Sequence, residues 1–427
     1  MNNTTFLEKL LDGAEVEWVA LGEICDVGDG NHSSKYPKSN EMVEQGVPFI
    51  RGTNMFNGTI SAQGMKFITP EKHQELRKGH LEAYDVLIAN RGEIGKIAQV
   101  PKHFSGSNLN SQLAWLRADR AIISPRYLFF VLNTTFIQNS ISGEGGALQQ
   151  LTIKNIKLIK IPIPCPENPE KSLAIQAEIV RILDTFTELT AELTAELTAR
   201  KKQYNYYRDQ LLTFEDGEVA WKPLGQVISN LRTGLNPRKN FKLNPQGATN
   251  SYVTVRELGG FDLVISEKTD RVNNEGLALI QRRSKLQAGD VLFSATGTIG
   301  RTALIAEQPK DWNIKEGVYA ITPVPALLNS RFLIYLLQST KIRRKFLASA
   351  DGSVVASVSM ASFRKLEIPV PALAEQARIV AILDKFDTLT HSISEGLPRE
   401  IELRQNQYEH YRDLLLNFPK KQTEGVA

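Results

Sequence analysis

Side chains that could recognise a nucleic acid occur in two separate stretches of this sequence. Lysine and arginine neutralise phosphates, arginine also pairs with guanine, and asparagine pairs with adenine through two hydrogen bonds. Taken singly, each such residue is also compatible with a solvated surface position. The candidates are Arg51, Asn54, Lys66, Asn90, Arg91, Lys96, Lys102 and Asn110 in the first stretch, and Arg232, Arg256, Arg282, Arg283 and Arg301 in the second.

Lys96 and Arg301 rank first because they occupy equivalent positions, each directly after a glycine turn. The turns are Gly92–Gly95 and Gly297–Gly300, where missing side chains would let the backbone approach DNA closely. The same glycines are equally compatible with a purely structural role.

The charge is distributed unevenly along the chain. The formal net charge is only +4, but residues 28–160 carry 16 basic against 10 acidic residues, and residues 229–349 carry 18 against 9. Two basic modules therefore alternate with acidic connecting segments. A basic surface favours nucleic acid, although it also serves solubility or an acidic protein partner.

The sequence lacks the motifs of an enzyme that acts on DNA. Its Asn-Pro dipeptides are not followed by the second proline of an adenine methyltransferase loop, and the glycine cluster 92–96 is too short for a phosphate-binding loop. Cys25, Cys165 and the six histidines lack zinc-ligand spacing. His32, in a polar loop, fits a solvated or base-contacting residue better than a general base. We expect no catalysis, metal or cofactor in this chain.

Composition favours a soluble, cytoplasmic protein. The hydrophobic fraction is 42% and the charged fraction 23%, which is ordinary for globular domains. Two cysteines fit a reducing compartment. The N-terminal residues lack the pattern of a signal peptide, and no apolar run is long enough to span a membrane.

The elements that must position the candidate residues repeat along the chain with a period of roughly 204 residues. Residues 175–190 and 375–390 are identical at 10 of 16 positions, and residues 203–214 and 407–418 at 8 of 12. The DVL-containing segments 81–96 and 286–301 correspond more weakly. The order is variable module, helical segment, variable module, helical segment.

Both helical segments carry strong helix signals. Asn168 and Pro169 form an N-cap and first-turn proline, and Pro371 opens the second segment. Apolar residues then recur at spacings of three and four. Ser394, Gly396 and Pro398 predict a break or kink in the second helix. We expect the two helices to pack against each other, antiparallel, as a coiled-coil-like spacer; the alternative is that each packs only on its own module.

The two modules are expected to be α+β. Residues 85–89 and 290–295 predict short strands that lead into the glycine turns, and residues 126–133 and 331–338 predict buried helices.

This organisation resembles the specificity subunit of type I restriction-modification systems over nearly the whole chain. The resemblance is carried by the paired IPIP and IPVP boundaries, the Q-A-x-I-V-x-I-L-D-x-F and Q-Y-x-x-Y-R-D-x-L-L motifs, and the paired D-V-L-x4-G-x-I-G-[KR] motifs. Each motif occurs twice. The repeated TAEL units within residues 188–200 resemble the tetrapeptide repeats of the family's IC subclass.

The resemblance implies two target-recognition domains, each reading half of a split, asymmetric site in double-stranded DNA. The expected boundaries are 13–160 and 216–367 for these domains, and 161–215 and 368–420 for the helical regions. The resemblance further implies two docked modification (methyltransferase) subunits and associated restriction and motor subunits. S-adenosylmethionine, ATP and Mg²⁺ would belong to these partners, and no membrane is involved.

Two features of the helical regions follow from this expectation. The tyrosine-arginine groups at the helix ends serve either internal packing or docking of the modification subunit; they are Tyr204, Tyr207 and Arg208, and Tyr408, Tyr411 and Arg412. The TAEL leucines, Leu189, Leu193 and Leu197, form a stripe that tolerates added units. Each unit would lengthen a helix by about 6 Å, so the repeat count could set the gap between the half-sites.

Two other functions remain open from the sequence. One is a stand-alone DNA-binding regulator without enzyme partners. The other is a fused methyltransferase or nuclease, which the missing motifs disfavour.

Overall fold

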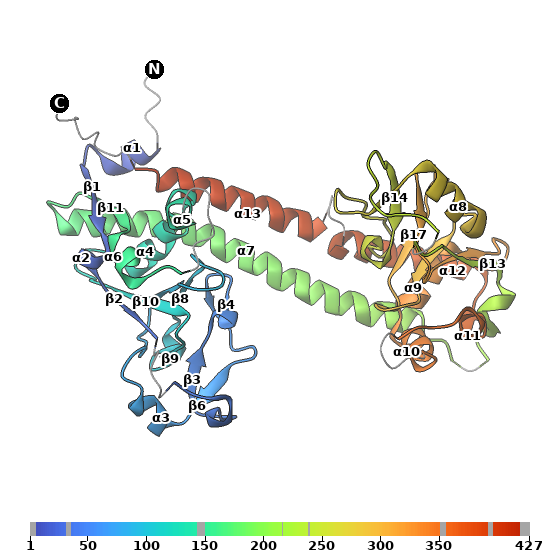
Figure 1. The fold of residues 1–427 in the computed structure, drawn as a ribbon, viewed down its shortest axis with the longest axis horizontal. Coiled ribbons are helices and arrows are strands. Elements are labelled where there is room, and N and C mark those ends of the chain that lie inside the picture. The colour runs from blue at the N-terminus through green and yellow to red at the C-terminus, as the bar shows by residue number, and fades with distance from the viewer. Residues whose placement is uncertain are drawn as a thin grey trace, which may run out of the picture. The chain divides into compact units, whose positions relative to one another are not determined.

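The computed structural model describes residues 6–30, 36–142, 150–215, 217–237, 240–350, 356–391 and 396–418, so His32 and Ser394 lie outside the described residues. The chain divides into two compact units (Figure 1). Unit 1 comprises Met1–Leu193 and Ile401–Ala427, and unit 2 comprises Thr194–Glu400. Each unit therefore combines one α+β module with parts of the long helices.

Unit 1 is built on a four-stranded antiparallel sheet. Its order is β2 (Cys25–Asp29), β10 (Leu113–Ala118), β7 (Val86–Ala89) and β8 (Ile97–Gln99). A mixed three-stranded sheet has the order β6 (Lys66–Ile68), β3 (Val47–Ile50) and β9 (Asn108–Leu109). Two two-stranded sheets pair β1 (Val16–Ala20) with β11 (Lys160–Pro164), and β4 (Met55–Phe56) with β5 (Thr59–Ile60).

Helix α4 (Pro125–Leu132) packs against β7, β8 and β10 of the four-stranded sheet, and α2 (Leu21–Ile24) and α6 (Ile153–Leu158) pack against β2. All residues from 127 to 132 in α4 are buried, as the apolar run predicts for a helix packed on every side. The other helices of the module are shorter or more exposed. The module's helices are α1 (Phe6–Leu11), α2 (Leu21–Ile24), α3 (Pro70–Glu75), α4 (Pro125–Leu132), α5 (Thr135–Ser142) and α6 (Ile153–Leu158).

Unit 2 repeats this topology except for the β4–β5 pair, which has no counterpart among the described strands of unit 2. Its four-stranded sheet has the order β13 (Ile228–Thr233), β19 (Val318–Pro323), β16 (Val291–Ser294) and β17 (Thr302–Leu304). The mixed sheet is β15 (Arg271–Val272), β14 (Asn250–Val253) and β18 (Trp312–Ile314), and β12 (Ala220–Pro223) pairs with β20 (Glu367–Val370). Its module helices are α8 (Asn274–Ser284), α9 (Ser330–Gln338), α10 (Thr340–Ala348) and α11 (Met360–Arg364).

The long helices begin and break where the sequence predicts. Helix α7 spans Pro169–Leu211, and the Asn168 side chain accepts a hydrogen bond from the amide of Lys171 at 3.0 Å, as an N-cap does. The second segment is two helices, α12 (Leu373–His391) and α13 (Gly396–Leu415). Gly396 has a φ of +78°, a conformation that favours glycine and marks the predicted break.

Within each unit the helices pack against each other. In unit 1, Phe186 of α7 stacks on Tyr411 of α13 at 5.3 Å, and in unit 2, Tyr207 of α7 stacks on Phe386 of α12 at 5.6 Å. The N-terminal half of α7 thus contacts α13, at the C-terminal end of the second segment, and the C-terminal half of α7 contacts α12, at the start of that segment. The two segments therefore pack antiparallel. The TAEL leucines, Leu189, Leu193 and Leu197, are half-buried, while the alanines and glutamates between them are exposed. The expected α+β class with two modules and packed long helices is confirmed.

Candidate nucleic-acid interface

A buried glutamine of each helical segment anchors the module that precedes it. Gln176 is fully buried, and its Oε1 accepts a hydrogen bond from the amide of Ser124 at 2.8 Å while its Nε2 donates to the carbonyl of Ile122 at 2.9 Å. Gln376 makes the same two bonds in unit 2, with Asn329 at 2.8 Å and Leu327 at 2.9 Å. The glutamine of the repeated Q-A-x-I-V motif therefore fixes the loop before α4 or α9.

An aspartate of the same motif forms a second anchor. Asp184 pairs with Arg126 of α4 at 2.7 Å, and Asp384 pairs with Arg331 of α9 at 2.7 Å. The Tyr335 hydroxyl also donates to Asp384 at 2.6 Å. Burial and this neighbouring carboxylate raise the pKa of Tyr335 strongly, so the hydroxyl remains a donor.

The tyrosine-arginine groups at the helix ends divide into buried and exposed members. Tyr204 and Tyr408 are buried in the hydrophobic cores of their units, with Arg208 and Arg412 against their rings. Tyr207 and Tyr411 are 41% and 37% exposed. The first pair is therefore occupied by internal packing, and only the second pair offers side-chain surface to a partner.

The aspartate that follows each arginine holds the end of a module helix. Asp209 accepts hydrogen bonds from the amide, at 3.0 Å, and the hydroxyl of Thr340 at the start of α10. Asp413 does the same for Thr135 at the start of α5, with 3.2 Å to the amide. Burial acts to raise the pKa of each carboxyl, but the threonine bonds and the adjacent arginine outweigh it and lower the pKa.

The three candidate asparagines are buried, at 5% exposure or less. Asn54 accepts from the amide of Arg51 at 3.1 Å and donates to the carbonyls of Ser61 and Gln63. Glu257 caps the corresponding turn of unit 2 through the amide of Thr254 at 2.7 Å. The Asn54 side chain thus has a structural role that a carboxylate also fills.

The other two asparagines also lie inside the module. Asn110 accepts from the amide of Gln112 at 3.1 Å. The Asn90 side-chain oxygen is buried with no hydrogen-bond partner among the described residues. In this conformation none of the three carboxamides is free to meet a base edge, which requires an exposed pair of donor and acceptor.

Arg232 is also used inside its module. Its guanidinium pairs with Asp290, which is fully buried, at 2.6 Å, and also donates to Thr322 at 2.6 Å. Asp85, at the equivalent position of unit 1, pairs with Arg117 at 2.9 Å. The aspartate of each D-V-L motif is thus neutralised by an arginine of the same four-stranded sheet, on the adjacent strand β10 in unit 1 and on β13, beyond β19, in unit 2. No local pattern identifies Arg232 as this partner, because the pairing joins residues that are 58 positions apart in the chain.

The remaining cations of unit 1 lie around two turns. Arg51 follows β3 and donates to the carbonyl of Gly64, and the exposed Lys66 opens the adjacent strand β6. Arg91 and Lys96 flank the β7–β8 turn, where Lys96 pairs with Glu93 and Arg91 donates to Gln150 at 3.0 Å. Lys102 is exposed in the short 3₁₀ helix after β8.

The cations of unit 2 form two groups. Arg301, exposed after the β16–β17 turn, donates to the carbonyl of Val255 at 3.4 Å, which places it beside the exposed Arg256. Arg256 also pairs with Asp270 at 2.8 Å. Arg282 and Arg283 lie in the last turn of α8, where Arg283 is 3.6 Å from Glu316.

The glycine turns before Lys96 and Arg301 have the same backbone in both units. Gly92 and Gly297 have φ values of +73° and +75°, and a Cβ at either position would meet no atom within 4 Å. Conformation, not space, thus favours glycine there. The turns present open surface at equivalent places in the two modules.

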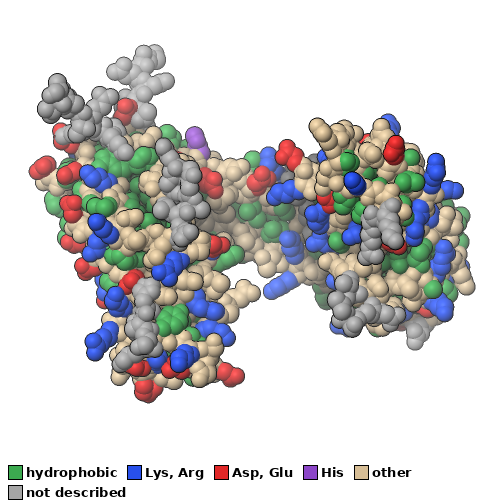
Figure 2. Space-filling view, viewed as in Figure 1, with side chains coloured by type: hydrophobic (Ala, Val, Ile, Leu, Met, Phe, Trp, Pro, Cys, Tyr) green, Lys and Arg blue, Asp and Glu red, His purple; other side chains and the backbone are tan. Residues whose placement is uncertain are grey.

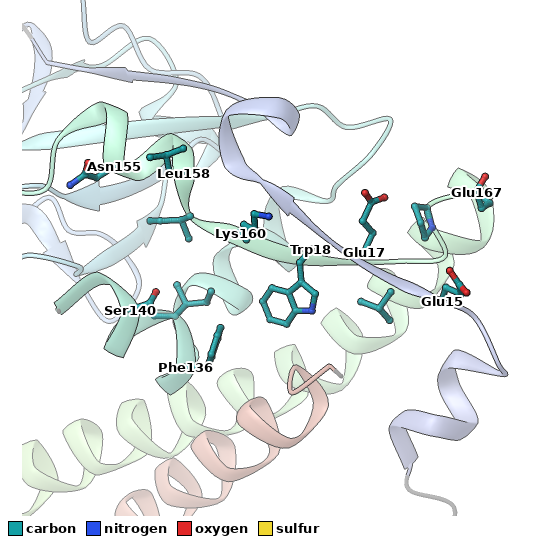
Figure 3. A pocket seen from close by; sticks show the side chains of 13 residues that line it. Glu15, Glu17, Trp18, Phe136, Ser140, Asn155, Leu158, Lys160 and Glu167 are labelled. Carbon is teal, nitrogen blue, oxygen red and sulfur yellow. The ribbon is translucent and has the colours of Figure 1, made fainter. Parts of the chain in front are cut away.

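Both units carry basic and acidic side chains on their surfaces, and unit 1 contains a cavity. Figure 2 shows lysine and arginine side chains on the visible face of both units, interspersed with acidic ones. Unit 1 also holds a cavity of about 830 Å³ between β1, α5, α6 and β11. Figure 3 shows the Trp18 ring beside Phe136 in this cavity, with Glu15, Glu17 and Glu167 toward one end.

Two kinds of feature are absent from the described part of the chain. No helix there is long and apolar enough to cross a membrane. No group of three or more His, Cys, Asp or Glu residues there is placed to hold a metal ion.

Comparison with known proteins matches both modules to one family. A family model for the type I restriction modification DNA specificity domain matches residues 14–200 and again residues 220–403. The chain is 38% identical to the specificity subunit of the type I restriction enzyme EcoR124I/EcoR124II of Escherichia coli, over 99% of both chains. It is 33% identical to a putative type I restriction enzyme specificity subunit of Haemophilus influenzae, over 98% of this chain and 99% of that one.

Solved structures share the fold at lower identity. One, determined to explain complex assembly and conformational transition of the type I restriction-modification system, gives a TM-score of 0.60 at 18% identity and covers 94% of this chain and 96% of that one. The type I S subunit of M. genitalium gives 0.50 at 14% identity, covering 96% and 97%. With the family model matching both modules, the chain belongs to the DNA specificity subunits of type I restriction-modification systems.

Proposed function

We propose that each module reads one half of a split DNA site and that the packed helices fix the distance between the halves. The recognition domains would be residues 13–160 and 216–367, and the helical regions residues 161–215 and 368–420. The boundary at 160 falls within β11, which pairs with β1, so a segment exchanged between proteins should include β11.

The observation that carries this proposal is the repeated module with cations at an equivalent open turn. Lys96 and Arg301 follow turns of the same conformation, and Arg256 adds a second exposed cation beside Arg301. Two modules of one topology can hold two DNA segments in the same manner, while their different side chains read different bases. Lys66, Arg91, Lys102, Arg282 and Arg283 are further candidates for phosphate or base contacts.

Exchange of one module tests this division. Residues 13–164 are replaced by those of a relative, and methylation of a genome carrying the complete system is mapped. We expect one half of the target to change and the other half and the gap to remain. A change in both halves would refute the modular division.

The helical ruler is tested by inserting one further TAEL unit after Leu197. Four residues add about 6 Å of helix, and a base pair rises about 3.4 Å, so the gap should widen by one or two base pairs. Both half-site sequences should persist, and an unchanged gap would contradict the proposal. Because Leu189, Leu193 and Leu197 repeat every four residues, an insertion preserves their stripe.

We further propose that the helical regions dock two modification subunits, with restriction and motor subunits joining that complex in the cytoplasm. S-adenosylmethionine, ATP and Mg²⁺ would bind to these partners. The half-exposed Tyr207 and Tyr411 are the best-placed members of the predicted docking groups. Tyr207→Ala and Tyr411→Ala should each weaken co-purification with the modification subunit encoded beside the gene, and unchanged binding in both would remove these rings from the interface.

A further inference from the structure

The helices α5 and α10, both labelled in Figure 1, have equivalent places in the order of elements of the two units. Their side chains are of opposite kinds. Both begin with a threonine held by an aspartate of a long helix, Thr135 by Asp413 and Thr340 by Asp209. The residues aligned by that start are Phe136, Gln138, Asn139 and Ser140 in α5, and Lys341, Arg343, Arg344 and Lys345 in α10. One helix has no charged residue in this stretch, and the other has four cations.

The surroundings of the two helices differ accordingly. In unit 1, Phe136 packs edge-on against Trp18 at 5.5 Å beside the cavity of Figure 3. In unit 2, the ammonium groups of Lys341 and Lys345 lie over the ring of Trp221 at 4.8 and 4.3 Å. These cation–π contacts fix the stems of two cations while the four charged residues stay exposed.

The cations of α10 continue the surface around the β16–β17 turn. A Cβ at Gly300 would lie 3.9 Å from Nη1 of Arg343, and Arg301 is the next residue in the chain. Arg301 in turn reaches the carbonyl of Val255 beside Arg256. Arg256 and Arg301 thus lie beside each other, and Arg343 of α10 lies at the glycine turn that precedes Arg301.

No salt bridge among the described residues involves the four cations of α10; Asp351, which follows the helix in sequence, lies outside them. Burial and the neighbouring charge of Lys341 lower the pKa of Lys345, although Glu367 acts in the opposite direction. Like charges held close repel each other, so an anionic ligand that replaced water there would relieve the repulsion.

We propose that α10 is a phosphate-binding helix that gives unit 2 extra contacts with the DNA backbone, contacts that unit 1 lacks. This proposal rests on the proposed DNA-reading function. The affinity that α10 adds does not discriminate between sequences, and it comes from Lys341, Arg343, Arg344 and Lys345. Continuity with Arg301 favours DNA over an acidic protein as the partner. Unit 2 then contributes more of the salt-dependent affinity than unit 1.

The test gives α10 the side chains that α5 has at the same positions: Arg343→Gln, Arg344→Asn and Lys345→Ser. The full chain is assembled with its modification subunits, and binding to a duplex carrying the mapped target is measured by fluorescence anisotropy at several salt concentrations. Each lost phosphate contact lowers the slope of log affinity against log salt by about 0.9. We expect the slope to fall by roughly 2 to 3 and the affinity to fall at least about tenfold near 0.1 M salt.

Two matched variants separate α10 from general charge. Arg343→Lys with Arg344→Lys keeps the charge and should keep the slope. Lys268→Ser, Lys310→Ser and Lys315→Ser remove three exposed cations elsewhere in unit 2 and should change the slope much less. Equal losses in this variant and in the α10 variant would overturn the proposal, because net charge would then explain both.

The methylated sequence separates affinity from sequence reading. The α10 variant should methylate the same target as the parent chain, and a changed target would overturn the proposal. An unchanged slope together with weaker assembly with the modification subunits would identify α10 as a protein-docking helix and also overturn it. If the parent assembly itself binds the mapped duplex no better than a random one, the proposed function fails and not only the role of α10.

Discussion

Replacing Gln176 by leucine should destabilise unit 1 far more than its modest change in volume suggests. The carboxamide is fully buried and makes three hydrogen bonds, to the amide of Ser124, the carbonyl of Ile122 and the hydroxyl of Ser172. Leucine fills the space but meets none of these groups. The loop before α4 then loses its attachment to α7.

The size of the effect follows from the groups left unpaired. A buried donor or acceptor without a partner costs about 1–3 kcal/mol, and the hydroxyl of Ser172 can rotate toward another acceptor. A net loss of about 3 kcal/mol for unit 1 is therefore expected, about a hundredfold in its unfolding equilibrium. Gln176→Glu should be tolerated at low pH and destabilising at neutral pH, because only the protonated acid can donate to Ile122 and burial favours that form.

Hydrogen exchange followed by mass spectrometry measures each unit separately. Amides in the α4 and β10 peptides of unit 1 should exchange about a hundredfold faster in Gln176→Leu, and peptides of unit 2 should be unchanged. Gln405→Leu, at an exposed position of α13 in the same unit, is the control and should have little effect. Acceleration below about fivefold, equivalent to about 1 kcal/mol, would refute the reasoning.

Three other predictions follow from the buried and anchoring groups. Arg232→Met should destabilise unit 2 by about 3–5 kcal/mol because it leaves Asp290 buried without its cation. Burial raises the pKa of Asp290 despite the bonds from Thr322, Gln287 and Arg232. The loss of stability, measured by urea unfolding, should therefore grow as the pH rises through that pKa and Asp290 ionises. Asp209→Asn and Asp413→Asn should lower the stability of the protein at neutral pH. Because the pKa of each aspartate is lowered in the folded protein, its stabilising contribution is present above the ordinary carboxyl pKa and disappears as pH falls through the lowered pKa. Acid unfolding curves of the parent and the variants should therefore converge. Burial raises the pKa of the Cys25 thiol to about 12, with Asp26 and Asp119 adding to it, so iodoacetamide near pH 8 should label the partly exposed Cys165 much faster than Cys25 when the products are counted by mass spectrometry.

The periodic elements could be predicted because local chemistry determines them. The stripe of α7, its Asn168 cap and the break at Gly396 depend on residues close together in sequence. The pairing of β3 with β9, parallel and across about sixty residues, has no such local signal. The arrangement in which each long helical segment is divided between the two units also has no local signal, because it depends on tertiary packing.

Residue type alone predicted the candidate site less well than it predicted the fold. Asn54 and Arg232 have side chains that suit base recognition. However, Asn54 accepts a hydrogen bond that closes a turn, and Arg232 pairs with a buried aspartate. A glutamate at the position equivalent to Asn54 was the available signal, because a carboxylate can accept the same amide bond. The cations of α10 were visible in the sequence, but only the structure places them beside the glycine turn.

Agreement and difference between the two halves therefore carry different information. Residues such as Gln176 and Gln376 agree because they make the same internal bonds, and their repetition marks attachment of module to helix. Phe136 and Lys341 differ while occupying the same turn of the equivalent helices α5 and α10, so the internal scaffold does not require either side chain. Positions that differ, are exposed and adjoin the glycine turns are consequently where two modules of one fold can acquire separate DNA contacts.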